Sequence, residues 1–117
     1  MHEISLVQGL FAQLHELAAA NNATKINKVT MEIGPLSGVV IDSFQFGFDI
    51  LAKEDQMLQS ADLIIEIPQV EYRCVACASV QTTSGPRPQE CSQCRELLLI
   101  PSGGDDLILL QVEMEQL

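Results

Sequence analysis

Hydrophobic residues at the start of the chain recur at spacings of three and four, which is the repeat of an amphipathic helix. The predicted helix runs from Ile4 to about Asn21. Its apolar stripe consists of Val7, Leu10, Phe11, Leu14, Leu17 and Ala18. The residues of Lys25–Ile33 then alternate between apolar and polar side chains, which predicts a half-buried strand. The chain therefore opens with a helix followed by a strand.

Residues 42–55 fit the pattern of a strand or of a helix. The phenylalanines of this segment alternate as in a strand, although two of them also lie one helical turn apart. Asp42, with Gln45 three residues later, resembles the capping box that begins many helices. The residues that follow favour helical structure, and we therefore predict a helix.

The second half of the chain contains three further apolar runs. Ala61–Tyr72 alternates like a strand, and Pro68 within it indicates an edge or a bulge. Leu97–Ile100 is a short apolar run that ends at Pro101. After a glycine-rich turn, Leu107–Met114 predicts a final strand.

Residues 73–96 have little apolar periodicity but hold all four cysteines, as Cys74-x-x-Cys77 and Cys91-x-x-Cys94, with thirteen residues between the pairs. Two such turns supply the corners of a tetrahedral four-thiolate cage, so we predict a structural zinc site. A redox dithiol pair and an iron–sulfur site are the alternatives. Zinc with four thiolates carries a charge of about −2. Three arginines flank the module and either offset that charge or face solvent: Arg73, Arg87 and Arg95.

Composition narrows the range of functions. Six basic and sixteen acidic residues among 117 give a formal charge of −10, which argues against binding nucleic acid or an anionic membrane surface. No run approaches the roughly 20 apolar residues of a membrane span, and the start of the chain lacks a basic leader. We therefore expect a cytoplasmic protein, in which four cysteines are ligands rather than disulfides. No Walker A motif occurs, so the chain is not itself a P-loop NTPase.

The first residues offer a second kind of metal site. At His2, a ring nitrogen, the amide nitrogen and the amine of Met1 can form fused chelate rings, a donor set that suits Ni(II) or Cu(II). A histidine at position 2 is weak evidence by itself. The other histidine, His15, falls inside the first predicted helix, where we expect an exposed or half-packed side chain rather than a ligand.

Taken together, the chain resembles the HypA/HybF family of nickel metallochaperones for [NiFe]-hydrogenase maturation. The resemblance covers essentially the whole chain, and its specificity lies in the combination of motifs. The residues that carry it are Met1–Leu6, Ile33–Val39, Phe44–Phe48, the paired C-x-x-C motifs and the closing strand after Gly103-Gly104.

The resemblance implies a carrier rather than an enzyme. Transferable Ni(II) would be bound at Met1, His2 and Glu3, and structural Zn(II) at the four cysteines. The family passes nickel onward with a partner GTPase of the HypB type, towards the hydrogenase large subunit and, in some organisms, towards urease maturation proteins.

Three positions depart from the family pattern. Glycine often follows the second cysteine of each pair, but Ala78 and Arg95 occupy these places here, so we expect strained or differently hydrogen-bonded turns. An acidic residue that serves some members as a further nickel ligand is replaced by Val40. Asp42, two residues away, is a candidate substitute.

The predicted fold is α/β: a three-stranded mixed sheet with two helices, plus a small zinc-ribbon-like module of four cysteines inserted before the last strand. Residues 1–72 and 101–117 are expected to form a nickel-binding α/β domain, and residues 73–100 a zinc-binding domain. Two competing functions remain at this stage. One is a zinc-ribbon module that binds a protein partner without a transferable metal, and the other is a redox enzyme that uses its cysteine pairs.

Overall fold

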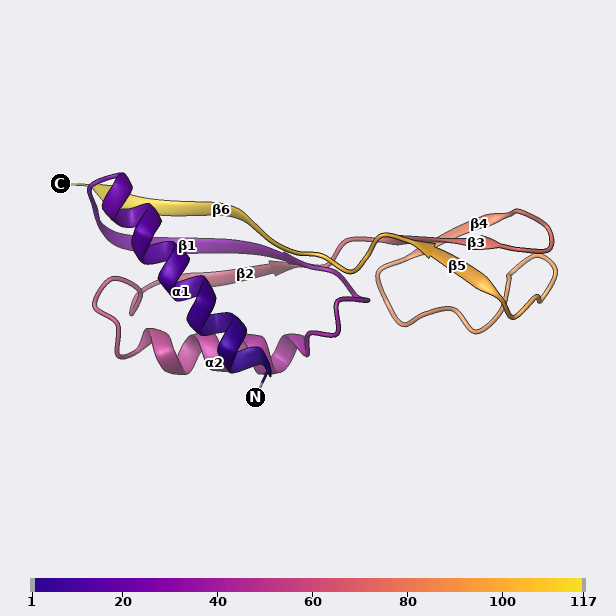
Figure 1. Ribbon diagram of the computed structural model, residues 1–117, viewed down its shortest axis with the longest axis horizontal. Helices are drawn as coiled ribbons and strands as arrows, with labels where there is room; N and C mark the ends of the chain where they lie inside the picture. The colour runs from indigo at the N-terminus through magenta and orange to yellow at the C-terminus, as the bar shows by residue number, and fades with distance from the viewer. Residues whose placement is uncertain (1, 117) are drawn as a thin grey trace.

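The computed structural model describes residues 2–116 and has two separate sheets arranged along a molecule of 58 × 26 × 17 Å (Figure 1). The elements are α1 (His2–Ala20), β1 (Ala23–Ile33), α2 (Ile41–Ala52), β2 (Asp62–Glu66), β3 (Val70–Cys74), β4 (Val80–Thr83), β5 (Leu99–Ser102) and β6 (Leu107–Gln116). The first sheet has the order β2-β1-β6 and the second the order β4-β3-β5. The predicted mixed sheet with two helices and an inserted module is confirmed. No helix of the described chain is long and apolar enough to cross a membrane.

The first sheet is built around β1, which pairs in parallel with β2 and antiparallel with β6. The parallel pair requires a crossover, and α2 lies within that connection. Both helices and β1 contribute to one hydrophobic core, in which Phe11 meets Phe48 edge to face with 5.3 Å between the ring centroids. This sheet and its two helices are called the α/β unit below.

The start of α2 differs from the prediction. Asp42 lies in the first turn instead of preceding it, and the amide of Gln45 donates to Asp49 at 3.0 Å, so the expected capping box is absent. The N-cap is Val40, whose side chain accepts no hydrogen bond. Its backbone N–H donates instead to the carboxylate of Glu3 at 3.1 Å. A carboxylate from α1 thus stands where an acidic group stabilises a helix N-terminus.

The predicted strand over residues 61–72 is two strands in different sheets. β2 ends at Glu66 and β3 begins at Val70, with no regular structure between them. Pro68 lies in this gap, and its missing N–H and fixed φ disfavour a continuous ladder. Pro101 was expected to end an apolar run, yet it lies inside β5. β5 is an edge strand, where a residue without an N–H is tolerated.

The second sheet carries its own small core and is called the cysteine module, residues 70–102. Its buried residues are Val70, Tyr72, Cys74, Cys91 and Leu99, and Leu36 of the α/β unit packs against them. A close backbone contact lies beside this junction, because the Leu36 N–H donates at 2.7 Å to the carbonyl of Gly104, in the connection between β5 and β6. A Cβ at Gly34 would clash with that same oxygen, so this close approach requires glycine.

Candidate metal centres

The fold brings the four predicted zinc ligands together. All four Sγ atoms of Cys74, Cys77, Cys91 and Cys94 lie within 4.8 Å of one another. The Cys74–Cys94 distance is 3.6 Å and the Cys77–Cys91 distance is 3.7 Å. For Zn–S bonds of about 2.3 Å, a regular tetrahedron has S–S edges of about 3.8 Å. The geometry and the all-sulfur donor set therefore fit a four-thiolate zinc site.

The two halves of the cluster are equivalent turns. Cys74 donates its N–H to the Ser79 carbonyl at 2.9 Å, and Cys91 donates its own to the Glu96 carbonyl at 2.8 Å. Each turn is closed by a returning bond, from Ala78 N–H to Cys74 and from Arg95 N–H to Cys91. Backbone N–H groups also point at the buried sulfurs, as at Ala76 and Gln93, 3.3 and 3.4 Å from their respective Sγ atoms.

Strain lies at the two positions where the resemblance places glycine. Ala78 has a φ of 60° and Arg95 a φ of 65°, so both residues adopt the left-handed conformation. This conformation costs an L-residue roughly 1–2 kcal/mol and costs glycine little. The turns keep the glycine geometry without glycine, and the expectation of strained turns is confirmed.

Hydrogen bonding within the cluster does not stabilise all of its cysteines as thiolates. The Ser79 hydroxyl and then the amides of Cys94 and Gln93 lower the pKa of Cys91 to about 6. At Cys94 the amide of Glu96 favours the thiolate, but the neighbouring thiols of Cys74 and Cys77 outweigh it and raise the pKa to about 12. Zinc bound by the cluster would supply the positive charge that stabilises all four thiolates.

Ser79 is a residue of the site that sequence reasoning missed. Its Oγ lies 3.0 Å from the Sγ of Cys77 and 3.2 Å from that of Cys91, so one hydroxyl spans both cysteine pairs. Hydrogen bonding to this hydroxyl lowers the pKa of Cys77 as well. The available signal was a serine two residues after a C-x-x-C motif, which is too common to identify a bridging group.

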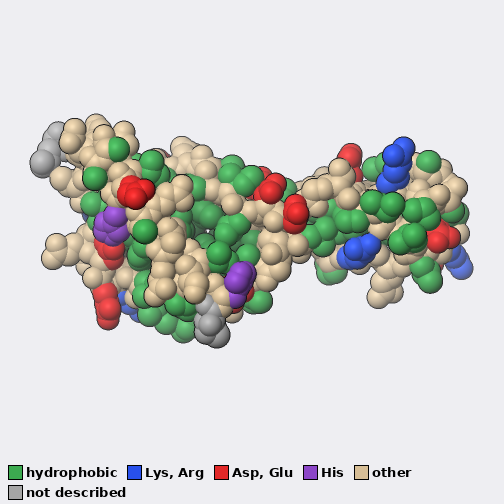
Figure 2. Space-filling view, in the orientation of Figure 1, with side chains coloured by type: hydrophobic (Ala, Val, Ile, Leu, Met, Phe, Trp, Pro, Cys, Tyr) green, Lys and Arg blue, Asp and Glu red, His purple; other side chains and the backbone are tan. Residues whose placement is uncertain are grey.

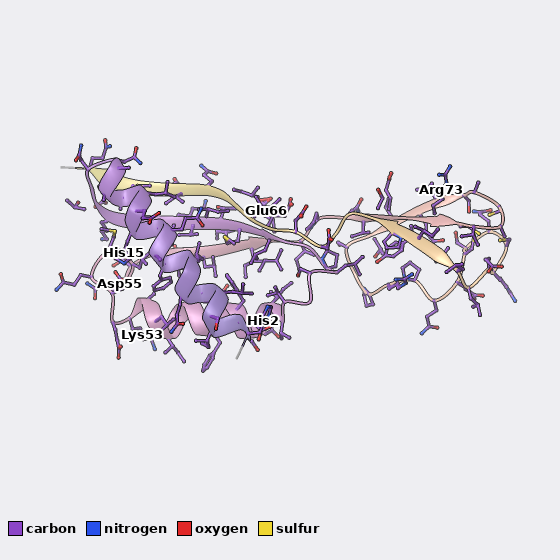
Figure 3. The ribbon with its side chains drawn as sticks, viewed as in Figure 1. His2, His15, Lys53, Asp55, Glu66 and Arg73 are labelled. Carbon is purple, nitrogen blue, oxygen red and sulfur yellow. The ribbon has the colours of Figure 1, made fainter. Side chains whose placement is uncertain are left out.

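His2 begins α1, and its side chain is 64% exposed (Figure 3). Its Nδ1 lies 3.5 Å from the Oε2 of Glu3, whose side chain is only 11% exposed. The hydrogen bond from Val40 N–H, and then that from Glu3's own amide, lower the pKa of the Glu3 carboxyl. Glu3 is therefore an anionic contact between the two helices beside an accessible imidazole.

The remaining predicted residues of this site are less defined. Met1 lies outside the described residues. Val40 contributes a backbone N–H at this end of α2, while its side chain is mostly exposed. Within residues 2–116, the four cysteines are the only group of three or more His, Cys, Asp or Glu side chains arranged to hold a metal. The side chains of His2 and Glu3 alone do not form such a group.

His15 has a structural partner. Its Nε2 lies 2.6 Å from the Oδ2 of Asp55, in the segment that follows α2. The other oxygen of Asp55 accepts the N–H of Met57 at 2.9 Å. The half-exposed histidine thus ties α1 to this segment, as Figure 3 shows, and fits the expectation of an ordinary side chain.

Comparison with known proteins agrees with this architecture. The family described as "Hydrogenase/urease nickel incorporation, metallochaperone, hypA" matches residues 1–114. The hydrogenase maturation factor HypA of Shewanella baltica is 36% identical, with 99% of this chain and 97% of the relative covered. That of Caldanaerobacter subterraneus is 34% identical, with 98% and 100% covered.

A solved structure extends the match to three dimensions. The solution structure of the Ni metallochaperone HypA from Helicobacter pylori superposes with a TM-score of 0.66 at 30% identity, and 97% of each chain is covered. The sequence match and the structural match both run the length of the chain, across the α/β unit and the cysteine module. This chain therefore belongs to the HypA family of non-enzymatic nickel metallochaperones.

Proposed function

We propose that this chain binds Ni(II) at its N-terminus and delivers it to a [NiFe]-hydrogenase large subunit during maturation. The observation that carries the proposal is the family match over residues 1–114, which takes in both the N-terminal histidine and the paired cysteines. Delivery proceeds with a partner GTPase of the HypB type in the cytoplasm, and urease maturation proteins are further candidate recipients.

Met1, His2 and Glu3 form the proposed nickel site. The imidazole of His2 is accessible, and the amide of the first helical residue has no acceptor within the helix, so both nitrogens are available. The amine of Met1 completes fused chelate rings around the metal. The Glu3 carboxylate lies beside Nδ1 and favours a cation there. A metal site that is exposed and only partly filled by ligands of this chain suits a carrier that must release its metal.

Zinc at the four cysteines is structural in this proposal. A closed four-sulfur shell leaves no open position for a substrate or a water molecule, unlike a catalytic zinc site. The proposed division of the chain follows the same logic, with residues 1–72 and 101–117 as the nickel-binding domain and residues 73–100 as the zinc-binding domain. The separate hydrogen bonding of the two sheets supports this division.

Calorimetric titration of Ni(II) into untagged protein tests the proposal. His2→Ala is expected to abolish stoichiometric binding while the zinc content and the helical circular dichroism stay unchanged. His15→Ala is the matched control, because it removes the only other imidazole and leaves the N-terminus intact. Unchanged nickel affinity in His2→Ala would contradict the proposal and leave a zinc-ribbon interaction module as the better description.

A second arm isolates the terminal amine. An N-terminal extension converts this amine into an amide, so nickel affinity is expected to fall by at least tenfold even though His2 is present. A C-terminal extension of equal length is the control. Equal affinity in the two extended chains would exclude the amine as a ligand, while His2 stayed in place.

A further inference from the structure

The second sheet has one face that no part of the described chain covers. Alternation along β3 sends Val70, Tyr72 and Cys74 inward to the small core, whereas Glu71 and Arg73 point to the opposite side. In the strand register, Arg73 lies between a residue of each edge strand, with Val80 on β4 and Ile100 on β5. We call this side the outer face of the module.

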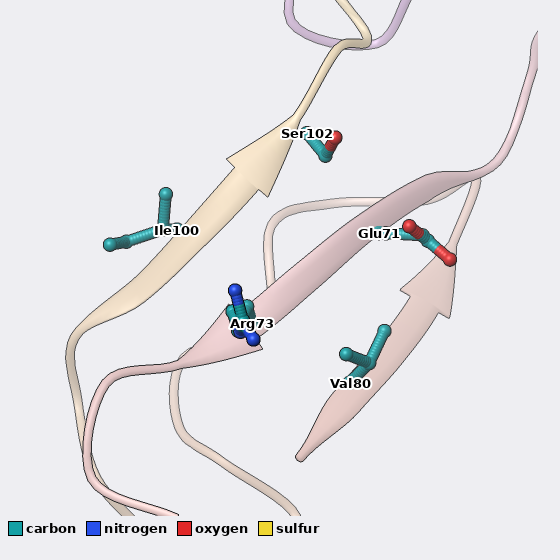
Figure 4. A pocket seen from close by; sticks show the side chains of 5 residues that line it. All are labelled: Glu71, Arg73, Val80, Ile100 and Ser102. Carbon is teal, nitrogen blue, oxygen red and sulfur yellow. The ribbon is translucent and has the colours of Figure 1, made fainter. Parts of the chain in front are cut away.

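The outer face is mainly apolar around Arg73. Val80 is 55% exposed and Ile100 is 53% exposed, and Leu98, two residues before Ile100 in the chain, is also exposed. A hollow of about 250 Å³ on this face, seen in Figure 4, is lined by Glu71, Arg73, Val80, Ile100 and Ser102. Figure 2 shows hydrophobic side chains beside basic ones over this end of the molecule. Clustered exposed apolar residues of this kind mark interaction sites.

The side chain of Arg73 has no partner within residues 2–116. Its guanidinium makes no hydrogen bond or ion pair in the described chain, whose ion pairs all lie in the α/β unit. Arg87 provides the contrast, because it donates to the Leu99 carbonyl at 2.6 Å and lies over the Tyr72 ring. An unpaired guanidinium between apolar side chains binds a carboxylate more strongly than a fully hydrated one does.

We propose that the outer face docks a partner-protein segment that places a single carboxylate on Arg73 and apolar side chains on Val80 and Ile100. Charge complementarity selects the carboxylate, and the guanidinium can bind it through two parallel hydrogen bonds. Glu71 at the other end of the hollow repels a second negative charge. The surface therefore favours one acidic residue in an apolar segment over a polyacidic run or a phosphate.

This docking surface is independent of the proposed nickel site. Figure 3 places Arg73 on the cysteine module and His2 at the start of α1, in separate parts of the molecule. A partner held at the outer face leaves the N-terminus exposed. The interaction is accordingly expected to survive His2→Ala, so its failure and the failure of nickel binding can be told apart.

A selection experiment tests this inference on the full-length, zinc-loaded chain. A phage library of random dodecapeptides is selected on the wild type after depletion on Arg73→Glu. Enriched peptides are expected to carry one Asp or Glu between apolar residues. Synthetic copies should bind the wild type at least tenfold more tightly than Arg73→Glu by fluorescence anisotropy, with weaker binding at higher salt.

Matched variants separate the charge from the apolar contacts. Ile100→Ser and Val80→Ser keep Arg73 and should weaken binding several-fold, whereas Leu97→Ser, at an exposed leucine outside the hollow, should not. Lys53→Glu makes the same charge change at an exposed position of the α/β unit and should leave binding unchanged. Zinc content is measured for every variant, and Arg73→Gln replaces Arg73→Glu if zinc is lost. Enrichment of basic peptides, or equal binding to the wild type and to Arg73→Glu, would overturn the inference.

Discussion

The α/β unit and the cysteine module are held together by different forces. Thirteen buried apolar residues form one core in the α/β unit, whereas the module buries five residues, two of which are cysteines. The burial of side chains such as Phe44 and Leu14 stabilises the larger unit without help, at about 1.5–3 kcal/mol for each large residue. A core of Val70, Tyr72 and Leu99 is too small to offset the entropy of ordering some thirty residues, so we expect folding of the module to depend on a metal bound by its four cysteines.

The α/β unit and the cysteine module also differ in formal charge. The module holds three acidic residues and all three arginines, so its formal charge is zero before the cysteines ionise. The rest of the chain holds thirteen acidic residues and three lysines and therefore carries the whole −10. The α/β unit, which begins at the proposed nickel site, attracts cations in general, whereas the much less acidic module suits a protein contact through its outer face.

The largest expected effect follows from breaking the zinc cage. Cys74→Ser removes one ligand, so zinc content is expected to fall from one per chain to near zero and amide protection across residues 70–102 to disappear. The α/β unit should remain folded, because its core contains no ligand. Hydrogen exchange read out by mass spectrometry, together with elemental analysis, checks both halves of the prediction.

A core variant supplies the reciprocal control. Phe48→Ala leaves a cavity against Phe11 and should destabilise the α/β unit by about 3–5 kcal/mol, with one zinc per chain retained. Retention of zinc and protection in Cys74→Ser would contradict the cage. Loss of zinc in Phe48→Ala would show that the module depends on the core of the α/β unit and that the two units are not stabilised separately.

Sequence patterns predicted most of the larger unit, because its periodicities reflect burial on a single core. The stripe from Val7 to Ala18 and the alternation within Lys25–Ile33 both become buried faces. The break at Pro68 was harder to predict. The residues on its two sides have the same strand pattern, and only the pairing partners show that they belong to different sheets.

The two candidate metal sites differ in how far they could be predicted from the sequence. C-x-x-C spacing fixes the geometry of a turn locally, so all four cysteines were found from the sequence. The contact between Glu3 and Val40 joins residues 37 positions apart, and no local pattern encodes it. Asp42 and Gln45 satisfied the capping-box pattern at the right place in the chain, yet the cap came from another helix. Polar contacts between residues far apart in the chain therefore could not be predicted from the sequence.

A smaller effect is expected from relieving strain in the module. Ala78→Gly and Arg95→Gly should each stabilise the zinc-bound turn by about 1 kcal/mol, because glycine adopts a positive φ without a Cβ clash. Since folding of the module is linked to zinc binding, this gain is expected to appear as several-fold tighter zinc binding in competition with a chromophoric chelator. Ala76→Gly, which lies in the same turn without a positive φ, is the control. Equal gains in all three variants would rule out strain relief.

The smallest expected effect concerns the α/β unit and its pH dependence. Glu3 contacts the N-terminal turns of both helices, and its pKa in the folded chain lies below the ordinary 4.5, so the ionised form stabilises the fold above that pH. Protonation removes this contribution as the pH falls through the lowered pKa.

The melting temperature of the wild type should therefore be slightly higher than that of Glu3→Gln at pH 7. It is measured by circular dichroism at 222 nm without added nickel, and the difference between the two melting temperatures should disappear towards pH 3. Glu16→Gln, on an exposed part of α1, reports the general effect of lost charge. A gap that widened at low pH would mean that Glu3 stabilises the helix contact as a neutral donor, and the electrostatic link between α1 and α2 would have to be abandoned.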